Sequence, residues 1–152
     1  KILMVLFPLA NGLSRVMAGA ISDRLGREST LAIFYILLGA AILSLALMGN
    51  IPILFVSMVI LASLLGGAPF AIYPATIGDY YGSKYATANY GITYTAKAWA
   101  GLISGWLSGY LVVRLGSYTG PLLLMAGGCL LAAVLSNPWV LKPPVSKSSG
   151  HT

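Results

Sequence analysis

Charged side chains are scarce in this 152-residue sequence, and acidic ones are the scarcest, with only three Asp and Glu residues. Charged residues make up 8% of the chain, against about 25% in soluble globular proteins, whereas hydrophobic residues make up 58%. The mean hydropathy is +0.87, and apolar runs approach the roughly 20 residues that cross a bilayer. These values exclude a soluble domain and predict an integral membrane protein.

Groups that commonly carry catalysis or bind metals are also few. The single cysteine, Cys129, lies in an apolar run, which excludes an intrachain disulfide and favours a buried packing role. The single histidine, His151, lies in the tail, and neither a metal-ligand spacing nor a phosphate-binding loop occurs. The nine basic residues are scattered, which does not favour nucleic-acid binding. We therefore expect no enzyme, metal, cofactor or nucleic-acid partner, and no ATP-driven pump.

Apolar windows separated by polar residues, glycine or proline predict an all-α membrane fold with five spans. The expected spans cover residues 2–22, 30–49, 52–77, 86–113 and 119–141, which together form one transmembrane domain, 1–141. Residues 142–152 are rich in proline and serine and predict a disordered tail. Pro69 and Pro74 predict a kink or local unwinding in the third span.

Lysine and arginine fall unevenly on the two sides of these spans. The richer side holds Arg24, Arg27, Lys84, Lys142 and Lys147, whereas the other side holds only Lys1 and Arg114. The positive-inside rule therefore predicts a cell membrane protein, in the plasma or inner membrane, whose tail is cytoplasmic. Because the sequence begins without Met and directly in apolar residues, we expect it to be a piece of a longer protein.

The fourth span carries glycines at every fourth position. Gly101, Gly105 and Gly109 form two overlapping small-xxx-small steps, a pattern that lets helix backbones approach closely in lipid. This glycine ridge predicts helix packing rather than ligand contact.

Two cations, Arg15 and Lys97, lie inside expected spans, and no acidic residue lies at comparable depth. A charge at mid-bilayer costs about 2.5–3.5 kcal/mol, so such residues usually serve a function. Arg15 is closer to its span's end, which leaves open that it extends toward the membrane surface. A guanidinium matches a carboxylate and an ammonium adds a second charge, so the pair predicts a dicarboxylate or a monocarboxylate substrate.

Other residues are expected near these cations. Helical spacing puts Asn11 one turn from Arg15, and puts Tyr90 and Tyr94 on the Lys97 side of their helix. Tyr94 can donate a hydrogen bond to the anion or fill a helix interface. Phe70 and Tyr73 are weaker candidates, since only their proximity to the prolines suggests them.

The segment GAISDRLGRE, residues 19–28, resembles the G-x-x-x-D-R-x-G-R-R loop of the major facilitator superfamily. The matching positions are Gly19, Asp23, Arg24, Gly26 and Arg27. Glu28 departs, since the family has a basic residue there. The resemblance implies a cytoplasmic loop between two helices of a transporter.

A closer likeness is carried by NGLSR, residues 11–15, and YGSKYATANYGITYTAK, residues 81–97. Both resemble the oxalate/formate antiporter family within that superfamily. The likeness covers nearly the whole chain and implies the last five of twelve helices, with the N-terminal half of the same protein and the lipid bilayer as partners. It also implies that Arg15 and Lys97 bind the substrate's carboxylates. Gly66 stands where oxalate-type members carry an aromatic residue, so lactate, pyruvate and formate remain open beside oxalate.

The expected function is secondary transport of a small organic anion by alternating access. Exchange is favoured over uniport, because an empty site with two positive charges resists movement. A monocarboxylate–proton symporter is one alternative. A non-transporting membrane receptor, or a truncated product that acts by interaction, is an alternative of another class.

Overall fold

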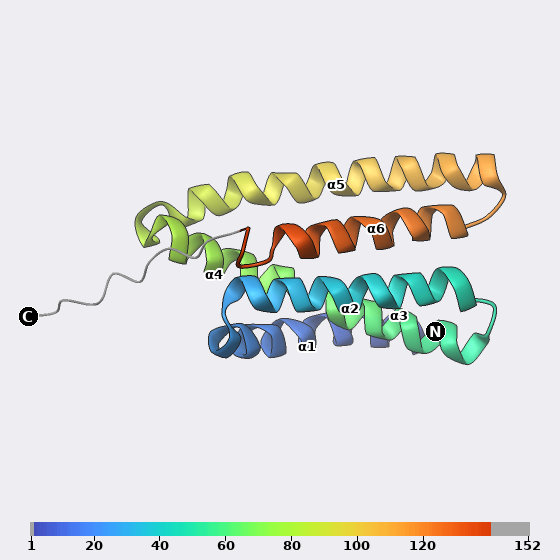
Figure 1. Ribbon diagram of the computed structural model, residues 1–152, viewed down its shortest axis with the longest axis horizontal. Helices are drawn as coiled ribbons and strands as arrows, with labels where there is room; N and C mark the ends of the chain where they lie inside the picture. Colours follow the sequence, from blue (N-terminus) through green and yellow to red (C-terminus); the bar gives the residue numbers. More distant parts are fainter. Residues whose placement is uncertain (1, 141–152) are drawn as a thin grey trace, which may run out of the picture.

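The computed structural model describes residues 2–140, and this part of the chain is helical with short connections (Figure 1). The elements are α1 (Ile2–Leu25), α2 (Arg27–Met48), α3 (Pro52–Gly66), α4 (Pro69–Tyr81), the short 3₁₀ helix η1 (Ser83–Tyr85), α5 (Ala86–Leu115) and α6 (Thr119–Leu135). No strand occurs between residues 2 and 140, so the all-α prediction is confirmed. The expected disordered tail, 142–152, lies outside the described residues.

Successive spans run up and down, with α3 and α4 together forming one span, so the connections between spans gather at two ends. The α1–α2 turn, the α4–α5 connection and the end of α6 lie at one end, and the α2–α3 and α5–α6 connections lie at the other (Figure 1). Arg24, Arg27 and Lys84 therefore share one end, and Arg114 lies at the opposite end. The side of the membrane that each end faces stays a prediction.

Three stretches are long and apolar enough to span a membrane: residues 5–25, 27–48 and 52–81. The 30-residue α5 is not among them, and α6 is a shorter apolar helix of 17 residues. The expectation that the last span reaches residue 141 is wrong, because α6 ends at Leu135. Pro138 explains the early end, since it lacks an N–H and disfavours a helical conformation at Asn137.

The third expected span is interrupted between α3 and α4. The break lies at Gly67 and Ala68, directly before Pro69, whereas Pro74 is accommodated inside α4. The Ala68 N–H donates to Leu65 O at 3.3 Å and the Phe70 N–H donates to Gly67 O at 3.2 Å, so the chain tightens here into three-residue turns. Pro69 then starts α4, which determines where Phe70 lies.

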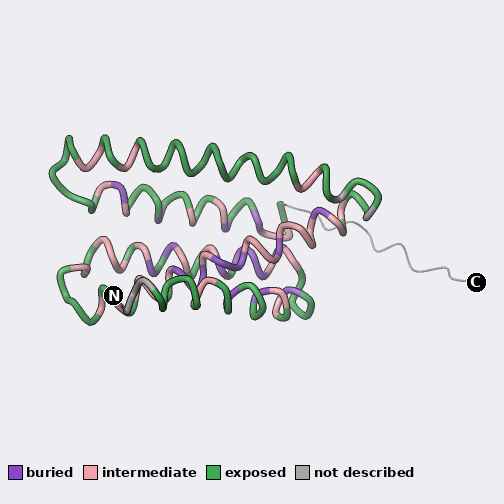
Figure 2. The backbone as a smooth tube through the Cα atoms, turned by 180° about the vertical axis from the view of Figure 1, so that it is seen from behind, coloured by how far each residue is buried: buried purple, intermediate pink, exposed green. Residues whose placement is uncertain are grey.

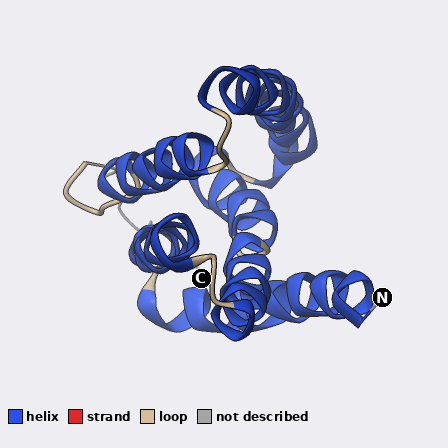
Figure 3. Cartoon of the chain, turned by 90° about the vertical axis from the view of Figure 1, so that its right-hand side faces the viewer, coloured by secondary structure: helices blue, strands red, loops and turns tan. Residues whose placement is uncertain are grey.

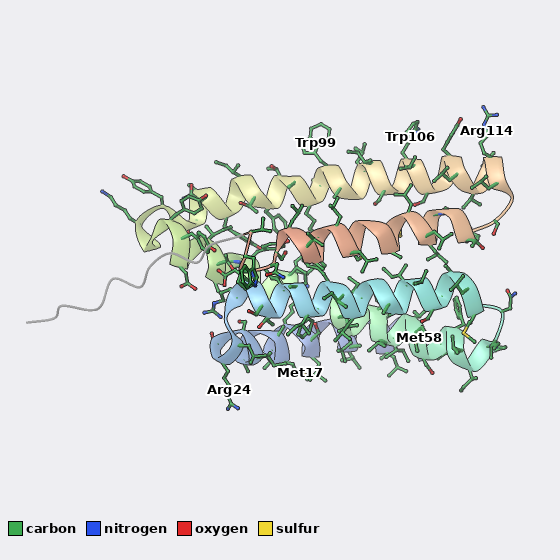
Figure 4. The ribbon with its side chains drawn as sticks, in the orientation of Figure 1. Met17, Arg24, Met58, Trp99, Trp106 and Arg114 are labelled. Atoms are coloured by element: carbon green, nitrogen blue, oxygen red, sulfur yellow. The ribbon has the colours of Figure 1, made fainter. Side chains whose placement is uncertain are left out.

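The apolar core lies where α1, α2 and the α3–α4 junction meet. Its buried members are Ala18, Leu31, Phe34, Leu65, Ala68 and Ile72. In contrast, α5 packs mainly against α4, α6 and η1 and is exposed along nearly its whole length (Figure 2), and the end-on view shows it at the edge of the bundle (Figure 3). Trp99, Trp106 and Arg114 point away from the other helices (Figure 4).

A seam between α1 and α3 depends on a very close approach at Gly67. A Cβ on Gly67 would overlap the Asn11 carbonyl oxygen and lie 2.6 Å from Ser14 Oγ. Across the same seam, Asn11 Nδ2 donates to Ser63 O at 3.2 Å and Ser63 Oγ donates to Phe7 O at 2.8 Å. The absent side chain at Gly67 therefore allows α1 to pack directly against the interrupted helix.

A second constraint lies at the Arg24 end of the bundle, where Arg27 joins α1, α2 and α4. Arg27 Nη1 donates to Asp23 at 2.5 Å and to Ser22 Oγ at 2.6 Å, and its Nε donates to Asp79 at 3.2 Å. Close by, the Tyr80 hydroxyl donates to the buried Glu28 carboxylate at 2.8 Å. All three acidic residues of the sequence, Asp23, Glu28 and Asp79, thus form one acidic cluster at this end.

Replacing Gly67 with alanine should separate α1 from the α3–α4 junction. We expect Gly67→Ala to lower the stability of the full-length protein by about 1–3 kcal/mol, as overpacking typically does. Gly66→Ala is the matched control, because a Cβ at Gly66 meets nothing within 4 Å. Thermal unfolding in detergent measures both, and equal Tm values for the two variants would contradict the close approach.

Replacing Arg27 with glutamine should loosen α4 from the α1–α2 turn. Because the partner carboxylates are largely exposed, we expect a loss of only about 1 kcal/mol, which high salt diminishes. Arg24→Gln is the control, since Arg24 is exposed and points away from the bundle (Figure 4). Unfolding at low and high salt tests this, and a salt-independent loss in Arg27→Gln would argue against the charge contacts.

Candidate functional site

The two predicted cations lie at similar depths along their helices. Lys97 follows the start of α5 at Ala86 by eleven residues, or about 16 Å. The first helix extends to Leu25, ten residues beyond Arg15, so Arg15 lies about 15 Å from the helix end. The expectation of a shallower Arg15 is therefore wrong, because α1 is longer than the predicted span.

Both cations face the same aromatic ring, that of Phe70 in α4. Lys97 Nζ lies 3.8 Å from the ring centroid, and the Arg15 guanidinium carbon lies 4.8 Å from it. The two charges are thus no farther apart than the sum of these distances. A ring face attracts a cation by about 0.5–2 kcal/mol, which offsets part of the cost of placing charge here.

Lys97 is held further by a residue one turn away on α5. Its Nζ lies 5.2 Å from the Tyr94 ring centroid and donates to the Tyr94 hydroxyl at 3.4 Å. Tyr94 in turn packs on Tyr90, with ring centroids 5.5 Å apart. The aromatic face of α5 therefore directs the ammonium toward Phe70.

Arg15 is oriented by the residue one turn before it. Its Nη2 donates to Asn11 Oδ1 at 3.3 Å, and Asn11 is fixed in turn by its bond to the Ser63 carbonyl. A guanidinium has five N–H donors, so most remain available for an anion. The close packing of α1 at Gly67 thus helps to fix the position of Arg15, because Asn11 contacts both.

Two cavities meet at Phe70 and Lys97. The α1 cavity, of about 440 Å³, is lined by these two residues together with Phe7, Asn11 and Arg15. The aromatic cavity, of about 420 Å³, is lined by Phe70, Lys97, Tyr35, Tyr73, Tyr90 and Tyr94. The structure therefore gathers all six predicted site residues, Asn11, Arg15, Phe70, Tyr90, Tyr94 and Lys97, around one shared wall, while their role in binding stays a prediction.

Neither cation forms an ion pair within the described part of the chain. The acidic cluster lies at the end of the bundle, where Asp23 follows Arg15 by eight residues, about 12 Å along α1, so it does not neutralise them. Two unit charges no more than about 9 Å apart repel by at least about 2 kcal/mol at an effective dielectric constant of ~20. An anion bound to both Arg15 and Lys97 would add two attractions that offset this repulsion.

Sequence reasoning did not single out Tyr35, on α2. It lies in an apolar run, LAIFYILLG, where an aromatic residue signals only packing. Its hydroxyl lies 2.7 Å from that of Tyr73, the weaker candidate from α4. This contact links segments 38 residues apart, which no local pattern reveals.

The glycines considered from the sequence lie apart from these cavities. Gly66 lines neither cavity, so its effect on the width of the site stays a prediction. A Cβ on Gly101, Gly105 or Gly109 would meet nothing within 4 Å, and all three are exposed. The glycine ridge has no packing partner among residues 2–140, and its packing role stays a prediction.

Comparison with known proteins bears on the family. The sequence profile of the Major Facilitator Superfamily matches residues 1–151. The chain is 35% identical over 147 residues to an uncharacterized 38 kDa protein in the 23S RNA operon of Thermoproteus tenax, a match that covers 96% of this chain and 38% of that protein. It is 31% identical over 112 residues to the oxalate:formate antiporter of Oxalobacter formigenes, which covers 71% of this chain and 26% of the antiporter.

The chain thus spans well under half the length of these two relatives. No solved structure matches it. The profile match over nearly every residue, together with the apolar helices, establishes that this chain is a multi-pass membrane protein that belongs to the Major Facilitator Superfamily.

Proposed function

We propose that this chain forms most of the C-terminal half of a secondary transporter that exchanges small organic anions across a cell membrane by alternating access. One observation carries the proposal. Two cations without a carboxylate partner among residues 2–140 converge on the Phe70 ring, at the shared wall of two cavities. The oxalate:formate antiporter among the relatives supports an anionic substrate.

In the proposed site, a substrate carboxylate bridges the two cations. The Arg15 fork donates two parallel hydrogen bonds to the carboxylate, and Lys97 adds a point charge from the other side. Asn11 and Tyr94 hold the two side chains in position before the anion arrives, which lowers the ordering cost of binding.

The charge balance favours exchange over uniport. With an anion bound, the site carries one net positive charge or none, whereas the empty site carries two. Moving the empty site through the occluded, low-dielectric state is therefore unfavourable. If the site returns with a second anion bound, this barrier is avoided.

The N-terminal half of the same protein is the proposed partner that closes the pathway, and the tail is proposed to be cytoplasmic.

Neutralising either cation should abolish most exchange. In liposomes with the full-length protein, we expect Lys97→Gln and Arg15→Gln each to reduce the exchange of labelled oxalate, formate or lactate by about 10–100-fold, because a charged hydrogen bond contributes roughly 1.5–3 kcal/mol. Arg114→Gln is the matched control. Arg114 is also an α5 cation beside an aromatic ring, 5.4 Å from Tyr110, but it lies at the opposite end.

Three outcomes would contradict the proposal. Lys97→Gln could retain full exchange, or no carboxylate could exchange in the wild-type protein, which would indicate a receptor if the anion still bound. Uptake driven by an imposed pH gradient into vesicles that contain no internal anion would instead indicate monocarboxylate–proton symport.

A further inference from the structure

The aromatic cavity contains more than a carboxylate site requires. Carboxylate binding uses Arg15 and Lys97, and both of these already border the α1 cavity. The aromatic cavity is lined in addition by the side chains of Tyr35, Tyr73 and Tyr90. Tyr35 on α2 and Tyr73 on α4 hydrogen-bond to each other at 2.7 Å.

This tyrosine pair retains hydrogen-bonding capacity. Each hydroxyl carries one proton and two acceptor lone pairs, and the mutual bond uses one proton. No other hydrogen bond of either hydroxyl is formed within the described residues. The pair can therefore donate one further hydrogen bond and accept others. Both tyrosine side chains are half-buried and line the cavity.

The charges around this cavity disfavour a second carboxylate. Among the described residues Lys97 is the only cation that lines it, and in the proposed site Lys97 already binds the first carboxylate. Burying another carboxylate among aromatic rings without a counter-charge is strongly unfavourable, whereas a hydroxyl or carbonyl oxygen needs only a hydrogen-bond partner. The ligand end that fits here is uncharged, carries one oxygen and is otherwise apolar.

We propose that the aromatic cavity is a second subsite, in which Tyr35 and Tyr73 bind the hydroxyl or oxo group of a monocarboxylate whose carboxylate lies between Arg15 and Lys97. The inference rests on the proposed function and specifies its substrate class as hydroxy- or oxo-monocarboxylates. Phe70 and Lys97 border both cavities, so a ligand whose carboxylate is bound beside Lys97 is proposed to extend from one cavity into the other. A dicarboxylate held by both cations would leave the tyrosine pair unused.

The test compares acids of equal size in liposomes that contain the full-length protein. The first pair is 3-hydroxypropionate and butyrate, the second is 4-hydroxybutyrate and valerate, and formate serves as a reference because it has no oxygen beyond its carboxylate. Competition against labelled formate gives the preference for the hydroxylated member of each pair. We expect the wild-type protein to prefer that member in at least one pair.

Three variants then remove hydroxyl groups and keep the rings. We expect Tyr35→Phe and Tyr73→Phe each to lower that preference, taken as a ratio within the same variant, by about 3–10-fold, because one neutral hydrogen bond is lost. The double variant removes the pair without leaving an unpartnered hydroxyl, which separates binding from stability. Tyr110→Phe is the control, since Tyr110 is exposed near the far end of α5.

The outcomes separate the subsite from the proposed function. The subsite alone would be overturned if formate exchange persists but the wild-type protein shows no preference for the hydroxylated acids. A preference for these acids that all three variants retain would have the same consequence. Oxalate outcompeting every hydroxy acid would also overturn it. An absence of exchange for every acid would overturn the proposed function.

Discussion

Arg15 and Lys97 both contact the ring of Phe70, whereas the three acidic side chains of the sequence lie elsewhere. The aromatic contact stabilises two charges but neutralises neither. An acid beside either cation would form an internal ion pair and remove the attraction for an external anion. The acidic cluster avoids this, because Arg27 binds Asp23 and Asp79, and Glu28 accepts a hydrogen bond from Tyr80. Separation of acids from the site is thus the constraint on which the proposed function depends.

Backbone features bring that ring and the two cations together. Pro69 restarts the interrupted helix, so Phe70 lies at the first turn of α4, between α1 and α5. Gly67 lets α1 pack closely against the α3–α4 junction, because no side chain intervenes. Asn11, which lies at this contact, accepts a hydrogen bond from Arg15 and so orients it. The positions of Arg15 and Phe70 therefore depend on Gly67 and Pro69, and Pro69 itself lines the aromatic cavity. Substitutions at Gly67 should affect the site even though Gly67 lines neither cavity.

The sequence could predict much of this arrangement, where the signals are local. Hydropathy predicted the helices, and helical spacing placed Asn11 beside Arg15 and Tyr94 beside Lys97. The sequence could not predict contacts between helices, such as that of Tyr35 with Tyr73, because an aromatic residue in an apolar run looks like any other core residue. The depth of Arg15 and the end of α6 were misjudged for another reason. Polar residues such as Asp23 and Arg24 can extend a helix beyond its apolar segment, and Pro138 ended one earlier than hydropathy suggested.

The most direct test of the account is a structure of the full-length protein with a bound carboxylate substrate. We expect the carboxylate oxygens to lie within hydrogen-bond distance of both the Arg15 guanidinium and Lys97 Nζ, next to the Phe70 ring. An acidic side chain from another part of the protein paired with either cation, or an anion bound away from Phe70, would contradict it.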